Sequence, residues 1–227
     1  MVTVDRVGAV GELVLNRPER RNALNGAVVE GLHLGLHHLI EDSSIHSILI
    51  RGNGGSLCSG LDLKDLATTP PPAWRAGFGA AWSAFHGEVW RSDKPIVGAL
   101  EGAAIAGGAA LALACDFLVA GRLARLQVSE VARGMVAPVN MAWLVTKYGH
   151  ARAIDVVVGA ASLDGADLWR LGMAAVLVDD ADVLRAARDL ASKLATHDAQ
   201  SVARSKAMAR SVALDFPALL RTLATGS

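Results

Sequence analysis

The chain of 227 residues has the length of a single α/β domain. With 52% hydrophobic and 19% charged residues, it has enough apolar side chains to bury a large core. Its 22 basic and 22 acidic side chains balance, which argues against nucleic acid or an anionic membrane as a partner held by overall charge. The sequence has no signal-peptide pattern and no apolar stretch long enough to span a membrane, so we expect a cytoplasmic location.

Short β-branched runs alternate with longer helical stretches along the chain. They predict strands at residues 12–16, 47–51, 95–100, 116–120 and 175–178. A helix over residues 26–41 is predicted by apolar residues at helical spacing, namely Val28, Leu32, Leu36 and Leu39. Strands that alternate with helices are typical of an α/β fold in which helices cover a largely parallel sheet.

The spacing of the histidines and cysteines does not predict a metal site. His33 and His37 have the i, i+4 spacing of a metal pair, but no carboxylate motif accompanies them. We interpret them as solvated or core-edge histidines. Cys58 and Cys115 lie far apart without CxxC or Cys/His spacing, which predicts reduced, buried thiols.

A stripe of aromatic residues follows a Pro-rich breaker at residues 68–72. Its members recur at helical spacing and are Trp74, Phe78, Trp82 and Phe85. The stripe has two interpretations, core packing or one wall of a pocket for an apolar ligand. The last third of the chain, from about residue 163 to residue 223, is predicted to be mostly helical and carries no candidate chemistry.

Two Gly-rich segments, residues 52–62 and 102–110, each lie where a predicted strand gives way to a helix. Glycine lets a ligand approach the main chain, and the first turn of a helix has unpaired N–H groups that can bind an anion or a developing oxyanion. Such segments also occur simply to let the chain bend. Neither matches a P-loop, a GxGxxG dinucleotide fingerprint or a GxSxG nucleophile elbow.

Five blocks in a fixed order resemble the signature blocks of the crotonase (enoyl-CoA hydratase/isomerase) family. They are residues 15–25, 58–63, 94–116, 148–153 and 166–178. The resemblance implies an α/β fold with a spiral core of ββα units over residues 1–180. A helical C-terminal region, residues 181–227, would follow and is shorter than usual for the family. It also implies a homotrimer or hexamer, which the longer C-terminal segment of the family usually helps to close.

The resemblance further implies a site for an acyl-CoA or enoyl-CoA thioester, with no separate cofactor and no metal. The main-chain amides of Leu61 and Gly107 would bind the thioester oxygen and stabilise an enolate. Positions along the CoA moiety and beside the thioester are matched by Arg20, Arg21, Ala23, Ser59, Asp62 and Leu63, and Ala110 and Pro138 are expected in the same substrate site. Arg20 and Arg21 have a second interpretation as part of a solvated basic loop, and Asp62 has one as a helix-start residue. A hydrolase or dehalogenase with Asp62 or Asp65 as nucleophile is a remote alternative.

Two positions depart from the pattern of the hydratases in this family. Hydratases resemble one another in having two glutamates, whereas this chain has Ala110 at the first position and Glu130 at the second. Pro138 matches a glycine whose amide helps to position water, and proline has no N–H group. One carboxylate is enough to move a proton between two carbons, so we predict isomerase-type chemistry with Glu130 as the base. The alternatives are a surface role for Glu130 and a non-catalytic acyl-CoA-binding protein.

Overall fold

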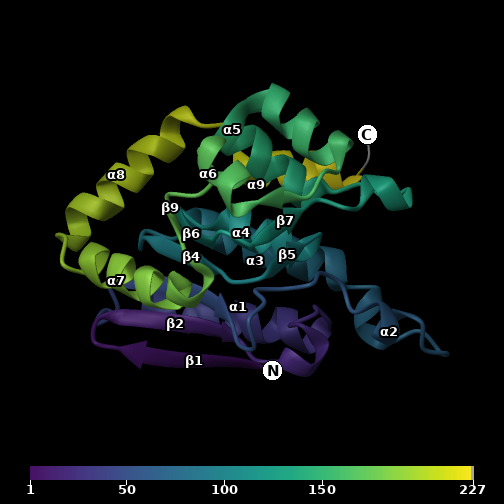
Figure 1. Ribbon diagram of the computed structural model, residues 1–227, viewed down its shortest axis with the longest axis horizontal. Coiled ribbons are helices and arrows are strands. Elements are labelled where there is room, and N and C mark those ends of the chain that lie inside the picture. The colour runs from purple at the N-terminus through teal and green to yellow at the C-terminus, as the bar shows by residue number, and fades with distance from the viewer. Residues whose placement is uncertain (226–227) are drawn as a thin grey trace.

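A six-stranded sheet runs through the centre of the computed structural model, which describes residues 1–225 (Figure 1). Its strands, in spatial order, are β1 (Val2–Val7), β2 (Val10–Leu15), β3 (Ser47–Gly52), β4 (Ile96–Leu100), β6 (Phe117–Gly121) and β9 (Val176–Val178). Only β1 is antiparallel to its neighbour in this sheet. The five predicted strands are confirmed with shifts of at most two residues at their ends. The alternating valines of β1 were not recognised as a strand.

A second sheet is formed by β5 (Ala103–Ile105), β7 (Arg125–Gln127) and β8 (Leu163–Asp164). The strand pair β4 and β5 is followed by helix α4 (Gly107–Ala114), and the pair β6 and β7 is followed by helix α5 (Pro138–Gly159). In each pair the first strand joins the large sheet and the second joins the small one. The predicted repetition of ββα units is therefore present in the chain.

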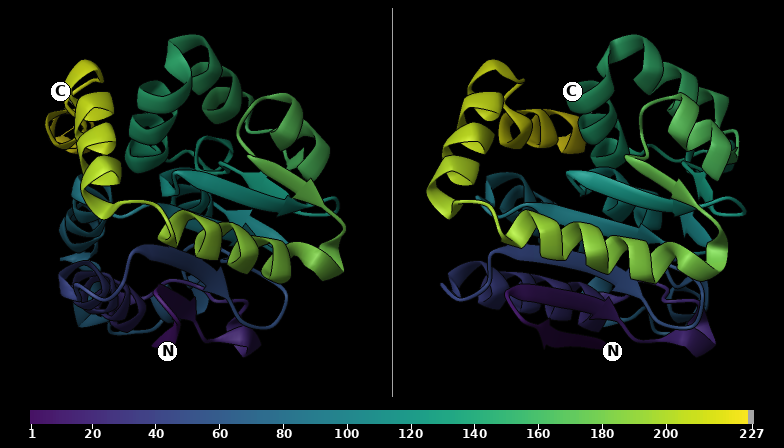
Figure 2. Two further views of the ribbon diagram at one scale, coloured as in Figure 1. Left: turned by 90° about the vertical axis from the view of Figure 1, so that its left-hand side faces the viewer. Right: turned by 60° about the vertical axis from the view of Figure 1, so that its left-hand side comes forward.

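Both faces of the large sheet are buried, as expected for parallel strands. On β3, Ile48 and Ile50 belong to the main core, whereas Leu49 packs in a second cluster on the opposite face. The main core also receives helices α1 (Gly26–Glu41) and α3 (Phe78–Arg91), and the second cluster is covered by α7 (Val183–Ala195). Figure 2 shows α7 lying along the sheet. The apolar positions predicted for α1 are all buried in the structure.

The remaining helices are α2 (Leu63–Leu66), α6 (Gly165–Arg170), α8 (Ala199–Val212) and α9 (Phe216–Thr225). Helix α8 rises from the end of α7 and has no buried residue (Figure 2). Helix α9 returns to the body of the protein, where Phe216 is fully buried against Trp90 and Trp143. Between residues 1 and 225, no helix combines the length and apolar character that a membrane crossing requires.

Helix α7 is attached to the sheet by a buried carboxylate as well as by apolar contacts. Glu12 on β2 accepts hydrogen bonds from Arg51 Nε at 2.7 Å and from Arg188 Nε at 2.6 Å. Burial would raise the pKa of Glu12, but the hydrogen bonds from Arg188 and Arg51 outweigh it and hold the pKa below its ordinary value. Glu12 is thus a carboxylate shared by two guanidinium groups.

We expect Glu12→Gln to lower the free energy of unfolding at pH 7 by roughly 2 kcal/mol, because it leaves Arg51 and Arg188 without their shared counter-charge. Chemical denaturation measures this change. Since the folded-state pKa of Glu12 is lowered, its contribution is complete above the unfolded value of about 4.3 and is lost as the pH falls through the lowered pKa. The difference between wild type and variant should therefore shrink in acid. Arg185→Gln, in an exposed pair with Asp182 on the same helix, should leave stability unchanged. A difference that persists in acid would contradict the assignment.

Candidate active site

The two Gly-rich segments come into direct contact. Cys58 N donates to Ala103 O, and Ile105 N donates to Cys58 O, both at 3.0 Å. A Cβ atom on Gly60 would lie 2.7 Å from Ile105 O, and one on Gly108 would lie 2.1 Å from Cys58 O. These glycines are required because the two main chains leave no room for a side chain.

The amides of Leu61 and Gly107 follow directly after this contact. Leu24 forms a β-bridge with Leu61. In this bridge Leu24 N donates to Gly60 O and Asp62 N donates to Leu24 O, so the Leu61 amide takes no part in the hydrogen bonds. Gly107 is the first residue of α4, where an N–H group has no partner within the helix. In the described chain neither amide donates a hydrogen bond to another protein group. Leu61 and Gly107 line the same cavity of about 730 Å³.

Asp62 is a structural residue at the edge of this cavity. It is the N-cap of α2, accepts hydrogen bonds from the amides of Lys64 and Asp65, and pairs with Arg17 at 3.0 Å. Burial would raise the pKa of Asp62, but the Asp65 amide and Arg17 outweigh this effect and lower it. The interpretation of Asp62 as a helix-start residue is confirmed. Its oxygens are engaged by these donors, which argues against a nucleophile.

The residues matched to the CoA positions lie along one wall of the cavity but differ in their partners. Arg20 lies 3.6 Å from Asp62 and 3.8 Å from Asp65, whereas exposed Arg21 has no ion-pair partner among residues 1–225. The same wall includes Ala23, Ser59 and Leu63. Arg21 is thus the arginine of the pair whose charge is available to an anionic ligand.

Glu130 lies in the cavity wall at the start of the short 3-10 helix Val131–Arg133. Its Oε1 accepts a hydrogen bond from Asn140 Nδ2 at 3.0 Å, while Oε2 is buried and has no partner within the described chain. Burial raises the pKa of Glu130, although hydrogen bonds from its own amide, from Asn140 and from Ser129, and the charge of Arg133, oppose the shift. A buried carboxylate with one free oxygen and a raised pKa has the properties of a general base.

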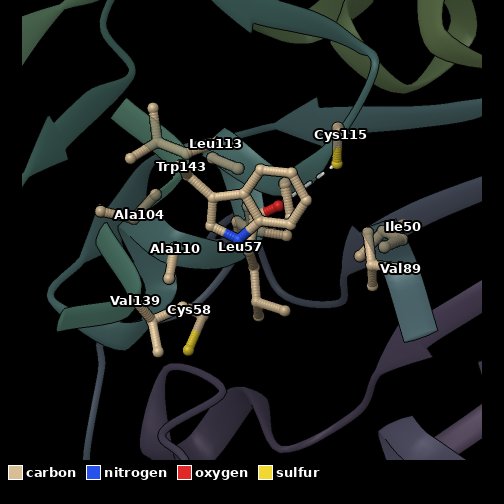
Figure 3. Close-up of a cluster of buried hydrophobic side chains, with 14 of the residues drawn as sticks. Ile50, Leu57, Cys58, Val89, Ala104, Ala110, Leu113, Cys115, Val139 and Trp143 are labelled. Atoms are coloured by element: carbon tan, nitrogen blue, oxygen red, sulfur yellow. Dashed lines mark hydrogen bonds between the residues drawn. The ribbon is translucent and has the colours of Figure 1, made fainter. Parts of the chain in front are cut away.

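Pro138 and Ala110, the two residues that depart from the hydratase pattern, lie in different surroundings. Pro138 is the first residue of α5 and lines the cavity without an N–H group to offer. Ala110 is fully buried and is not among the cavity-lining residues. Figure 3 shows it within a buried cluster that also contains Cys58, Val139 and Trp143. At neither position can a side chain transfer a proton.

The aromatic stripe divides between its two interpretations. Phe78 and Trp82 line the cavity, and Trp82 lies 3.8 Å from the position that a Cβ atom on Gly107 would take. Phe85 is fully buried and stacks on Trp82 from the core side. The stripe therefore forms one apolar wall of the cavity and continues into the core behind it.

The histidines and cysteines singled out by spacing lie outside this site. His33 and His37 are partly exposed and each contacts Glu88 of α3, at 3.0 and 2.8 Å. Residues 1–225 contain no group of three or more His, Cys, Asp or Glu residues that could hold a metal ion. Cys58 and Cys115 are free, buried thiols, as predicted, and burial raises the pKa of each to about 12.

Sequence reasoning missed the polar neighbours of Glu130. Asn140 is buried at the cavity wall and contacts Glu130, and the buried hydroxyl of Ser129 also lies in this wall. Arg17, which pairs with Asp62, lies in the block of residues 15–25 and was not predicted as a site residue. Asn140 did carry a signal, because it is a polar residue where the family resemblance leads one to expect a small one.

Comparison with known proteins places this fold and cavity in a family. The model of the enoyl-CoA hydratase/isomerase family matches residues 5–222, and the chain belongs to that family. A relative from Mycobacterium tuberculosis, "Probable enoyl-CoA hydratase echA8", is 30% identical over 90% of this chain and 79% of its own. The 1,2-epoxyphenylacetyl-CoA isomerase of Escherichia coli is 32% identical over 81% of this chain and 72% of its own.

The solved structures agree with this assignment. A protein of Legionella pneumophila described as an enoyl-CoA hydratase/isomerase (crotonase) superimposes with a TM-score of 0.86 at 25% identity. The alignment covers 94% of this chain and 83% of that protein. The predicted crotonase fold is therefore confirmed.

Proposed function

We propose that the protein is a cytoplasmic enzyme of fatty acid metabolism that shifts a double bond in an enoyl-CoA thioester. The observation that carries the proposal is one cavity lined by Leu61 and Gly107, whose main-chain amides have no acceptor in the described chain, and by Glu130, a buried carboxylate with one unpaired oxygen. Two amides directed at the thioester oxygen would stabilise the enolate. Glu130 would take the proton from one carbon and return it to another.

The absence of a second acid in the proposed mechanism favours isomerisation over hydration. Addition of water requires activation of the nucleophile and protonation of the α-carbon, which paired carboxylates normally share. Ala110 has no polar atom, and Pro138 has no amide with which to position water. Isomerisation needs neither group, because the same carboxylate can remove and return one proton.

We expect the wild-type protein to interconvert 3-enoyl-CoA and trans-2-enoyl-CoA and to exchange acyl-CoA α-protons with D2O. Glu130→Gln should lower both rates by about 10²- to 10⁴-fold, because the amide cannot accept the proton. Chromatography of the products and mass spectrometry of the exchanged substrate measure the two rates. In wild type the rate should fall on the acid side of a pKa above 4.5, the ordinary value of a glutamate, because the base must be ionised.

Glu101→Gln is the matched control for this variant. Burial also raises the pKa of Glu101, but this residue lies outside the cavity, so its variant should keep wild-type rates. Full activity in Glu130→Gln would refute the assigned base. A wild-type protein that binds an acyl-CoA in calorimetry but neither isomerises it nor exchanges its protons would refute the proposed activity. It would instead be a non-catalytic acyl-CoA-binding protein, the alternative that Ala110 at the first glutamate position also allows.

Arg21 is proposed to contact a phosphate of CoA. We expect Arg21→Gln to weaken CoA binding about tenfold at low salt, and the loss should shrink as salt is added. Arg20→Gln should cost less, because Asp62 and Asp65 already neutralise Arg20. Isothermal titration calorimetry measures both affinities, with Arg122→Gln as a control that lies outside the cavity and pairs with Asp179. Equal affinities of wild type and Arg21→Gln would count against this contact.

A homotrimer or hexamer is proposed from the family resemblance. Apolar side chains left exposed on α5, α6 and α8 support it, among them Val158, Trp169, Met208 and Val212. Sedimentation velocity should give a mass near three or six times 23.6 kDa. A monomer at micromolar concentration would contradict the assembly.

A further inference from the structure

Asn140 contacts both halves of the proposed catalytic apparatus. It is the third residue of α5 and is buried, with an exposed fraction of 2%. Its Nδ2 donates one hydrogen bond to Glu130 Oε1 at 3.0 Å and another to Ala106 O at 3.1 Å. Both partners are acceptors, which determines the orientation of the side-chain amide. One residue therefore joins the carboxylate to the turn that precedes α4.

The second of these hydrogen bonds acts on the peptide unit that carries the Gly107 amide. The carbonyl of Ala106 and the N–H of Gly107 belong to the same planar group, so a donor that fixes the carbonyl also fixes the direction of the N–H. Hydrogen bonding at the carbonyl also polarises the peptide and strengthens its N–H as a donor. Asn140 thereby acts on the Gly107 amide without touching a substrate.

The backbone at Ala106 needs such support. Its φ of 53° and ψ of −116° lie in a region that residues with a side chain rarely adopt, at a cost of about 1–3 kcal/mol. Ala106 N donates to Gln127 O at 2.8 Å, and its carbonyl accepts from Asn140. The carbonyl also accepts from Ala110 N at 3.2 Å, so the strained residue is held by one hydrogen bond at its N–H group and two at its carbonyl.

Asn140 is a poor choice for stability alone. Its Oδ1 is buried with no partner in the described chain, and the same is true of Ser129 Oγ and Glu130 Oε2. An unpaired buried polar atom costs about 1–3 kcal/mol. Three such atoms, on residues that line one cavity, are typical of a site organised for a ligand rather than for stability.

We propose that Asn140 is a positioning residue that couples the base Glu130 to the oxyanion donor Gly107, an inference that rests on the proposed function. Because Asn140 holds Oε1, the free Oε2 of Glu130 takes the proton. The C–H bond of the substrate breaks, an O–H bond forms at Oε2, and the electron pair moves to the thioester oxygen at the Leu61 and Gly107 amides. Return of the proton to another carbon restores the carboxylate.

The coupling between Asn140 and Glu130 can be detected as a change in the pKa of Glu130. A hydrogen bond to an ionised carboxylate lowers its pKa, so loss of Asn140 should raise the pKa of Glu130 beyond the rise that burial already causes. Arg133, on the following turn, is the charged residue whose field acts on Glu130. The other charged residues of the cavity wall are Glu19, Arg20, Arg21, Asp62 and Lys64, from two different segments, and none of them changes in the test.

Asn140→Ala tests the inference. We expect kcat for isomerisation or α-proton exchange to fall about 10- to 100-fold with little change in KM, because orientation is lost and binding is kept. The acid limb of the pH profile should move to higher pH, and ¹³C NMR titration of the Glu130 carboxyl should move with it. Gln200→Ala, which removes an exposed side-chain amide on α8 outside the cavity, should change neither.

Asn140→Asp is the second variant, in case the smaller side chain impairs folding. It keeps the size of the side chain but removes both donors, and its own carboxylate should raise the pKa of Glu130 further. An unchanged pH profile and an unchanged Glu130 titration in a folded variant would overturn the inference. If the wild type shows no turnover, the proposed function fails, and the Glu130 titration alone still decides whether Asn140 acts on the carboxylate.

Discussion

The contact between the main chains of two turns determines the geometry of the candidate site. The N–H and carbonyl groups of Cys58 bond to Ala103 and Ile105, and the approach is so close that Gly60 and Gly108 cannot carry side chains. A Cβ atom on either glycine would collide with a main-chain carbonyl oxygen of the other segment. The amides of Leu61 and Gly107, which follow this contact, have no acceptor in the described chain, and both residues line one cavity.

The sheet explains why these two turns meet. β3 and β4 are parallel neighbours, so the segments that leave their carboxyl ends emerge at the same edge. Burial of both faces of the sheet, by the main core and by α7, holds this edge in place. Residues that lie far from the cavity, such as Glu12 and Arg188, therefore contribute to its geometry through the position of the strands.

The polar residues in and behind the cavity wall fall into two groups with different energetics. Asp62, Arg17 and Asn22 are satisfied by hydrogen bonds and hold the loop over residues 17–25 against the turn at residues 52–62. Glu130 and Asn140 each retain a buried oxygen without a partner in the described chain. A satisfied network stabilises the fold, whereas unpaired buried atoms cost stability and are kept where a ligand would bind them.

The sequence by itself determined five strands of the large sheet and the helix over residues 26–41, because strand and helix periodicity are encoded in residues close together in the chain. The family followed from the resemblance of its ordered sequence blocks. Only the tertiary structure decided which charges are available. It paired Arg20 with Asp62, left Arg21 without an ion-pair partner among residues 1–225, and brought Asn140 to Glu130 and Ala106. These contacts join segments up to about forty residues apart, and no local pattern encodes them, because they depend on how helices pack on the sheet.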